Sequence, residues 1–257
     1  MKRAYLDLPY GQMHYRYAGE GEPVILLHMS GFSSAEYELA GDILAGKGYK
    51  VYAPDFMGFG NSDRGDHYFS FNEHADSIKA FADALGIKSA YIAGNLVGAN
   101  ITSRIAAKYP ELVKKACMFH VCFNKDPEFY PGLRKNFSVI PIEDDGSHMA
   151  ALWARSHKYG DTPEISNIRC QSLHTAGDWG EALHWALCED TDIYAALPKV
   201  ACKARVYAYS VMEHETPRDA AELMQKCDYE FLPDSTPYIA RAEPDRYVEK
   251  LLEVFEG

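Results

Sequence analysis

The chain has 257 residues and a net charge of −11, with no apolar run near the length of a membrane span. A chain of this length can bury one large core, and its acidity argues against nucleic acid or an anionic membrane surface as a partner. The N-terminus lacks the apolar stretch of a signal peptide, and the six cysteines form no C-x-x-C pair, as is typical of reduced thiols. We expect a cytoplasmic protein with a small-molecule ligand, no cofactor and no metal; a homodimer is compatible with this sequence.

Strands and helices alternate along most of the chain, a pattern typical of a parallel sheet covered by helices on both faces. The hydrophobic spacing predicts strands over residues 5–8, 13–17, 23–28, 50–54, 113–121, 204–209 and 229–232, and a short one beginning at Ala90. It predicts helices over residues 37–47, 71–85, 98–109, 217–226 and 244–255. Between 123 and 198 the alternation stops, and Trp-, Tyr- and His-rich helical segments predict a cap over a core formed by residues 1–122 and 199–257.

The stretch from Gly94 to Gly98 (Gly-Asn-Leu-Val-Gly) has the spacing of the G-x-S-x-G nucleophile elbow. Such an elbow raises one side chain above the sheet on a strained turn between a strand and a helix. Here the raised residue is Leu96, whose side chain has no atom able to attack a substrate. The frame of a hydrolase site is therefore present without its nucleophile.

Four segments together resemble the α/β-hydrolase superfamily: residues 24–28, residues 53–62, the Gly94–Gly98 elbow and the helix entry at 242–244. The resemblance covers nearly the whole chain. It implies an α/β-hydrolase fold, with a mostly parallel eight-stranded sheet, helices on both faces and a helical cap. It says little about the reaction, because this fold hosts many chemistries.

The resemblance also assigns positions to a catalytic triad, in the chain order nucleophile, acid, histidine. These positions fall on Leu96, Glu213 and Pro237, and the sequence has no histidine after His214. Since the triad acts as a unit, losing the nucleophile or the histidine costs about as much as losing all three. Acyl-enzyme hydrolysis by the usual route is therefore not expected.

An oxyanion hole made of backbone amides can outlast the loss of side chains. By resemblance its donors are the amides of Ser30 and Val97. The candidate general bases are His28, His120 and Glu213, each of which also has a structural interpretation: orienting a loop, being a satisfied buried histidine, or being an ordinary loop carboxylate. His214 could act in place of Glu213.

Further residues are expected to line the pocket. Cys122 is either a replacement nucleophile or a small core residue, and Asn95 either binds a ligand or caps the turn. The aromatic cap favours an apolar or aromatic ligand, and the spacing of its histidines does not favour a metal site. The predicted pocket residues are Leu96, Asn95, Met29, Cys122, Trp153 and Trp185.

Three hypotheses follow. The first is an enzyme of lyase, isomerase, cyclase or carbon–carbon bond chemistry that uses the oxyanion hole and a general base. The second is a non-catalytic ligand-binding relative, in which the elbow only forms the pocket floor. The third is a hydrolase in which an activated water molecule takes the place of a nucleophilic side chain.

Overall fold

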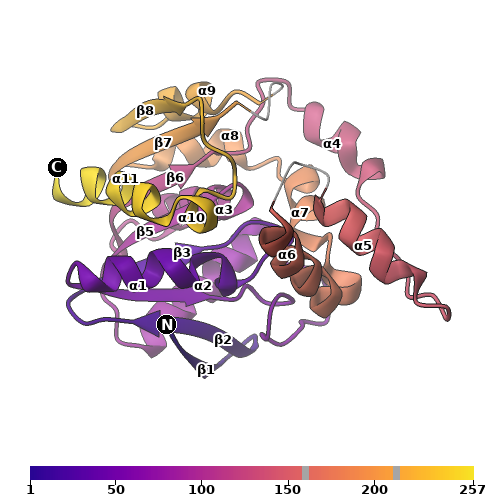
Figure 1. The fold of residues 1–257 in the computed structure, drawn as a ribbon. Helices are drawn as coiled ribbons and strands as arrows, with labels where there is room; N and C mark the ends of the chain where they lie inside the picture. The colour runs from indigo at the N-terminus through magenta and orange to yellow at the C-terminus, as the bar shows by residue number, and fades with distance from the viewer. Residues whose placement is uncertain (158–161, 211–214) are drawn as a thin grey trace.

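The computed structural model describes residues 1–157, 162–210 and 215–257 and shows the eight-stranded α/β fold expected from the sequence (Figure 1). The strand order is β1-β2-β4-β3-β5-β6-β7-β8. β1 and β2 form an antiparallel edge pair, β2 runs antiparallel to β4, and the remaining neighbours are parallel. The strands are β1 (Lys2–Leu8), β2 (Gly11–Ala18), β3 (Glu22–Leu27), β4 (Tyr49–Pro54), β5 (Ala90–Asn95), β6 (Val113–Phe119), β7 (Lys203–Tyr209) and β8 (Cys227–Leu232).

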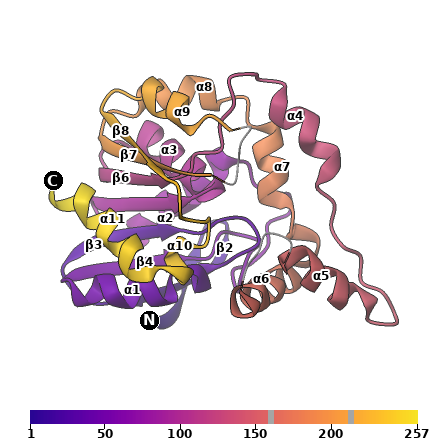
Figure 2. The same cartoon turned by 45° about the horizontal axis from the view of Figure 1, so that its top comes forward.

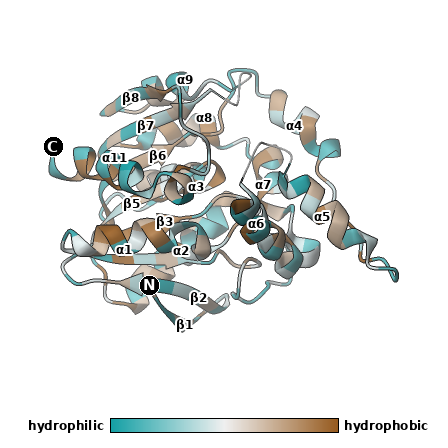
Figure 3. Cartoon of the chain, in the orientation of Figure 1, coloured by the Kyte–Doolittle hydropathy of each residue, from teal (hydrophilic) through white to brown (hydrophobic). Residues whose placement is uncertain are grey.

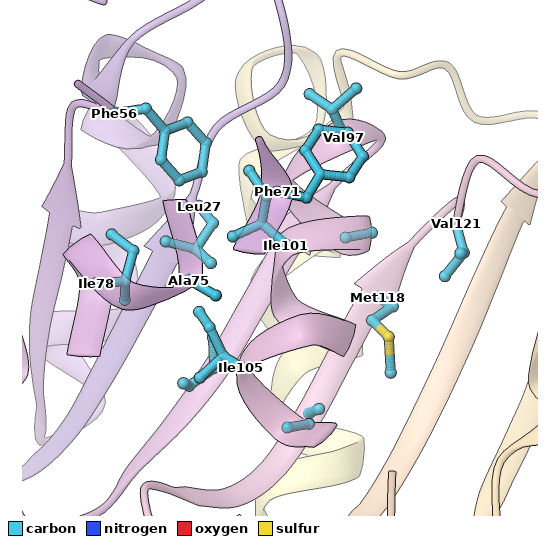
Figure 4. Packing of buried hydrophobic residues seen from close by; sticks show 14 of the residues in the cluster. Leu27, Phe56, Phe71, Ala75, Ile78, Val97, Ile101, Ile105, Met118 and Val121 are labelled. Carbon is cyan, nitrogen blue, oxygen red and sulfur yellow. The ribbon is translucent and has the colours of Figure 1, made fainter. Parts of the chain in front are cut away.

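Helices cover both faces of this sheet, because successive side chains of its central strands point to opposite sides. In β3, Val24 and Leu26 join the core cluster beneath α1 and α11, whereas Ile25 and Leu27 join the cluster beneath α2, α3 and α9. Figure 4 shows the second cluster, with Leu27 close to side chains of α2 and α3. The core helices are η1 (Ser34–Tyr37), α1 (Glu38–Gly46), α2 (Phe71–Ala84), α3 (Val97–Lys108), α9 (Pro217–Leu223), α10 (Ile239–Ala242) and α11 (Pro244–Glu256).

Local sequence signals set several helix ends. Ser70 and Glu73 form a reciprocal capping box that starts α2. Pro217 and Pro244 occupy the first turns of α9 and α11, where a missing N–H is tolerated. The predicted helix over 217–226 is shorter than expected and ends at Leu223, because the chain leaves helical geometry at Met224 before entering β8.

The chain between β6 and β7 supplies the helices that stand beside the sheet in Figure 2. We keep the name cap for residues 123–198. Its tip before α5 is hydrophilic (Figure 3). Its elements are α4 (Phe129–Leu133), η2 (Arg134–Asn136), α5 (Ser147–His157), α6 (Pro163–Ala176), η3 (Gly177–Trp179), α7 (Ala182–Glu189), α8 (Ile193–Ala196) and η4 (Leu197–Lys199).

The cap is fixed to the core by packing and by charge. A β-carbon at Gly58 would lie 1.9 Å from the Trp179 ring, so only glycine lets this ring approach the loop after β4. Arg104 of α3 forms a buried ion pair with Asp190, just after α7. Within the described ranges, no helix is both long enough and apolar enough to cross a membrane.

Candidate active site

The turn between β5 and α3 has the predicted elbow geometry. Leu96 adopts φ 49° and ψ −117°, a conformation that is strained for a side chain of this kind. A β-carbon at Gly94 would lie 2.1 Å from the Gly98 carbonyl oxygen, and one at Gly98 would lie 2.2 Å from the Leu27 carbonyl oxygen. Both glycines are therefore required for strand, turn and helix to pass this closely.

The side chain of Leu96 faces apolar neighbours from both the core and the cap. It packs against a small cluster that contains Met29, Phe32 and Tyr238 from the core together with Ile165 of α6. Met29 and Leu96, two predicted pocket residues, thus belong to one apolar cluster that includes Ile165 of the cap.

The two predicted cap residues, Trp153 and Trp185, lie elsewhere. Trp185 lines a cavity of about 140 Å³ between α7 and the start of α2, and its indole N–H donates to the Phe137 carbonyl (3.0 Å). Trp153 is 40% exposed and stacks on His157. Leu96 does not line this cavity.

The two backbone amides assigned to the oxyanion hole are unoccupied by protein acceptors. Within the described part of the chain, neither the Ser30 amide nor the Val97 amide donates a hydrogen bond. Val97 begins the 12-residue helix α3, whose dipole favours negative charge at this end. Both amides thus keep a free donor, as the predicted oxyanion hole requires.

His28 is buried directly behind this loop, and both of its nitrogens are engaged. Nδ1 donates to the Met29 carbonyl (2.9 Å), and Nε2 accepts from the Phe56 amide (3.1 Å). Burial lowers the pKa of His28, so the ring is held neutral. This arrangement matches the loop-orienting interpretation and leaves no nitrogen of His28 free for proton transfer.

His120 follows β6 in a left-handed conformation (φ 61°) and is also occupied. Its Nδ1 accepts from the Tyr209 amide (3.1 Å). Its Nε2 lies 2.8 Å from Glu215 Oε2, a close contact that does not meet hydrogen-bond geometry. The Tyr130 hydroxyl donates to the other Glu215 oxygen (2.9 Å). Glu213 and His214 lie outside the described residues.

Cys122 lies next to this group as a fully buried thiol. Burial raises its pKa, and the nearby Glu215 raises it further, so the thiol stays protonated. Asn100 bonds both the amide and the carbonyl of Cys122 (2.9 Å each) and thereby fixes this segment of chain to α3. These contacts favour the structural interpretation of Cys122.

A buried polar network beneath the elbow was missed from the sequence. Asn95 Nδ2 donates to Glu36 Oε1 (2.7 Å) and to the Pro237 carbonyl (2.6 Å), and Asn95 Oδ1 accepts from the Tyr209 hydroxyl (3.2 Å). The loop where relatives carry the catalytic histidine thus lies beside the elbow. Glu36 gave no signal, because a glutamate near a helix start is usually an exposed first-turn residue.

A histidine of the cap that was not among the predicted site residues also lies near the elbow loop. His184 Nδ1 donates to Glu181 Oε2 (2.6 Å) and lies 3.4 Å from the Ser30 hydroxyl oxygen. Arg155 donates to the other oxygen of Glu181 (2.6 Å), and Phe137 stacks on the imidazole, with ring centroids 4.5 Å apart. The side chain of His184 is 27% exposed, and its Nε2 has no partner among the residues described. Its only sequence signal is the i,i+3 spacing from Glu181.

Comparison with known proteins gives a consistent family assignment. The family model of the alpha/beta hydrolase fold matches residues 22–158. The 2-hydroxymuconate semialdehyde hydrolase of Pseudomonas putida is 35% identical over 99 residues, which are 38% of this chain and 35% of that protein. The 2-hydroxy-6-oxo-6-phenylhexa-2,4-dienoate hydrolase of Comamonas testosteroni is 36% identical over 118 residues, 42% of this chain and 40% of that protein. The matches to these curated relatives thus span well under half of their length.

Solved structures extend the likeness to the whole chain. An enol-lactonase from Burkholderia xenovorans LB400 superposes with a TM-score of 0.80 at 16% identity, covering 99% of this chain and 100% of the other. E-2-(acetamidomethylene)succinate hydrolase gives a TM-score of 0.81 at 19% identity, covering 100% and 99%. At these identities the likeness concerns the fold alone.

Proposed function

We propose that this chain, which belongs to the α/β-hydrolase family, catalyses proton transfer at a carbon next to a carbonyl group, without a covalent serine intermediate. One observation carries the proposal: His184, oriented by Glu181, contacts Ser30, the residue whose free amide forms half of the oxyanion hole. In the described part of the chain, His184 has an open and partly exposed Nε2, whereas both nitrogens of His28 are hydrogen-bonded and Nε2 of His120 is buried against Glu215.

The proposed chemistry gives each of these groups one task. The amides of Ser30 and Val97 hold the carbonyl oxygen as it becomes an enolate oxygen, and His184 Nε2 removes or returns the proton on carbon. Glu181 fixes the tautomer by accepting from Nδ1, and Arg155 neutralises the charge of Glu181. A positioned base contributes about 10²-fold to 10⁴-fold, and each oxyanion donor about 10²-fold to 10³-fold. Leu96 then serves as apolar floor, which is consistent with lyase, isomerase or carbon–carbon bond chemistry.

The names of the relatives suggest a substrate class. The Comamonas protein is named for a substrate that carries an enol hydroxyl on a diene and a distant ketone. Moving the enol proton to carbon in such a molecule needs an oxyanion hole and a base but no nucleophile. The buried side chains that pack around Leu96 (Met29, Phe32 and Ile165) are apolar, which favours an aromatic or apolar substituent over a charged one.

The test uses 2-hydroxy-6-oxo-6-phenylhexa-2,4-dienoate in deuterated buffer, followed by absorbance and mass spectrometry. The wild-type protein is expected to convert the dienol to its keto form with one deuterium on carbon and without cleavage. His184→Gln should lower this rate about 100-fold or more, while the matched cap variant His174→Gln, at an exposed position of α6, should leave it unchanged. Cleaved products would instead indicate a hydrolase that activates water, and equal rates for both variants would remove His184 from the mechanism.

A second candidate is a ligand-binding protein without catalysis. The packing of Leu96 with Met29, Phe32 and Ile165 favours it, since these side chains fill the place above the elbow. Saturable binding of the dienol, measured by fluorescence, with no conversion above the buffer rate would support this candidate over the enzyme.

A further inference from the structure

Glu36 is a carboxylic acid buried at the meeting point of three segments of the site. It lies in η1, is only 1% exposed, and is surrounded by the loop after β3, the end of β5 and the aromatic side chains of β7 and α11. An acid in such a place is costly to bury unless its oxygens are hydrogen-bonded. The position therefore points to a specific task.

The two oxygens of Glu36 accept hydrogen bonds from residues next to the two halves of the proposed oxyanion hole. Oε2 accepts from the Met29 amide (2.8 Å), and Met29 is the residue immediately before Ser30. Oε1 accepts from Asn95 Nδ2 (2.7 Å), and Asn95 lies two residues before Val97. One rigid carboxyl group thus links the segment just before the Ser30 amide to the segment just before the Val97 amide.

We infer that Glu36 is a positioning residue that sets the separation of the Ser30 and Val97 amides, by holding Met29 and Asn95 to the two ends of one carboxyl group. The inference rests on the proposed use of these amides as an oxyanion hole. It assigns to Glu36 no contact with the substrate. Asn95 carries the same restraint onward to the Pro237 carbonyl and the Tyr209 hydroxyl.

The protonation state of Glu36 gives this role a measurable signature. Burial raises the pKa of Glu36 to about 8. The other titratable groups packed around Glu36 change charge at other pH values. Burial holds the pKa values of Tyr37, Tyr209 and Tyr247 well above 10 and lowers the pKa of His28. When Glu36 loses its proton, both of its oxygens become stronger acceptors, so the bonds to Met29 and Asn95 tighten together.

The experiment follows the amide nitrogens of Met29, Ser30 and Val97 by carbon-detected NMR from about pH 6 to about pH 10, a range that spans the Glu36 transition. In the wild-type protein all three are expected to shift with one shared midpoint near the Glu36 transition. Glu36→Gln should abolish this shared transition. The control Glu38→Gln, a half-exposed glutamate two residues away that pairs with Arg16, should retain it.

Three results would overturn the inference. They are a Met29 transition that Ser30 and Val97 do not share, a transition that persists in Glu36→Gln, and no transition in the wild-type protein. The first and third of these results are measured on the wild-type chain alone. The inference can therefore be overturned even if Glu36→Gln does not fold. Because no substrate is involved, loss of the proposed enzymatic activity and loss of the Glu36 inference are separate outcomes.

Discussion

The two sides of the elbow treat their polar groups in opposite ways. On the core side, His28, Glu36 and Asn95 are at most 1% exposed, and each makes hydrogen bonds with both of its polar side-chain atoms. On the cap side, the side chain of His184 is 27% exposed; its Nδ1 lies near Glu181 and Ser30, and its Nε2 has no partner among the residues described. A side chain whose polar atoms are all hydrogen-bonded keeps its neighbours in place, whereas a histidine with an open nitrogen can exchange a proton. This comparison supports the proposal that the cap supplies the reactive group and the core holds the geometry of the site.

The largest effect is expected from breaking the core side at Gly98. Gly98→Ala places a methyl group 2.2 Å from the Leu27 carbonyl oxygen and 2.8 Å from that of His28, and backbone atoms cannot yield as a flexible side chain would. We expect a loss of about 4 kcal/mol or more in the free energy of unfolding, measured with urea. The matched change Gly46→Ala, at the open end of α1, should leave stability the same or slightly higher. A loss below about 1 kcal/mol for Gly98→Ala would contradict the close packing of the elbow.

The next effect concerns the charge of Glu36. Between the pKa of about 4.5 expected in the unfolded chain and the value of about 8 in the fold, the native state holds one proton more than the unfolded state. The contribution of Glu36 to the free energy of unfolding is therefore fully present below about pH 4.5. It is lost as the pH rises to about 8, by at most about 1.4 kcal/mol per pH unit. Glu36→Gln should remove this slope from a series of urea unfolding curves. A slope identical to that of the wild-type chain would show that Glu36 is ionised in the fold at neutral pH.

A smaller effect separates the two histidines. His28→Gln disrupts two buried hydrogen bonds and the packing on Phe56, so we expect a loss of about 1–3 kcal/mol. His184→Gln should change stability by no more than about 0.5 kcal/mol, since the residue is partly exposed. Thermal or urea unfolding of the two variants side by side checks the contrast. Equal losses would remove the distinction between a structural histidine in the core and a functional one in the cap.

Local patterns were sufficient for most of the fold. The alternation of apolar strands and amphipathic helices predicts all eight strands, and the Gly94–Gly98 spacing predicts the elbow, because these signals act over a few residues. The end of α9 was placed three residues too late, at 226 instead of Leu223, since no glycine or proline marks that boundary.

The site was less accessible to sequence reasoning, because its decisive contacts join distant segments. His184 meets Ser30 across 154 positions, and Glu36 meets Asn95 across 59. Nothing in the neighbourhood of either residue in the sequence reports such a contact. The sequence places His28 and His120 at strand ends, but only the structure reveals that both nitrogens of His28 are hydrogen-bonded and that Nε2 of His120 is buried against Glu215. What a histidine can do depends on its hydrogen-bond partners, and these partners are set by the tertiary structure.

The smallest expected effect is a test of the elbow itself, Leu96→Ser. The change restores the G-x-S-x-G motif, but the chain from Glu215 to the C-terminus has no histidine to activate the serine. We therefore expect a fluorophosphonate probe to label this variant no faster than the wild-type protein, by mass spectrometry of the intact chain. Labelling at residue 96 would mean that an existing histidine reaches the elbow, and His184, which contacts Ser30, is the first candidate. Loss of labelling in the double variant Leu96→Ser, His184→Gln would then show that the cap histidine activates the serine on the core. A core residue could in that case be reactive, and the division between a reactive cap and a rigid core would not hold.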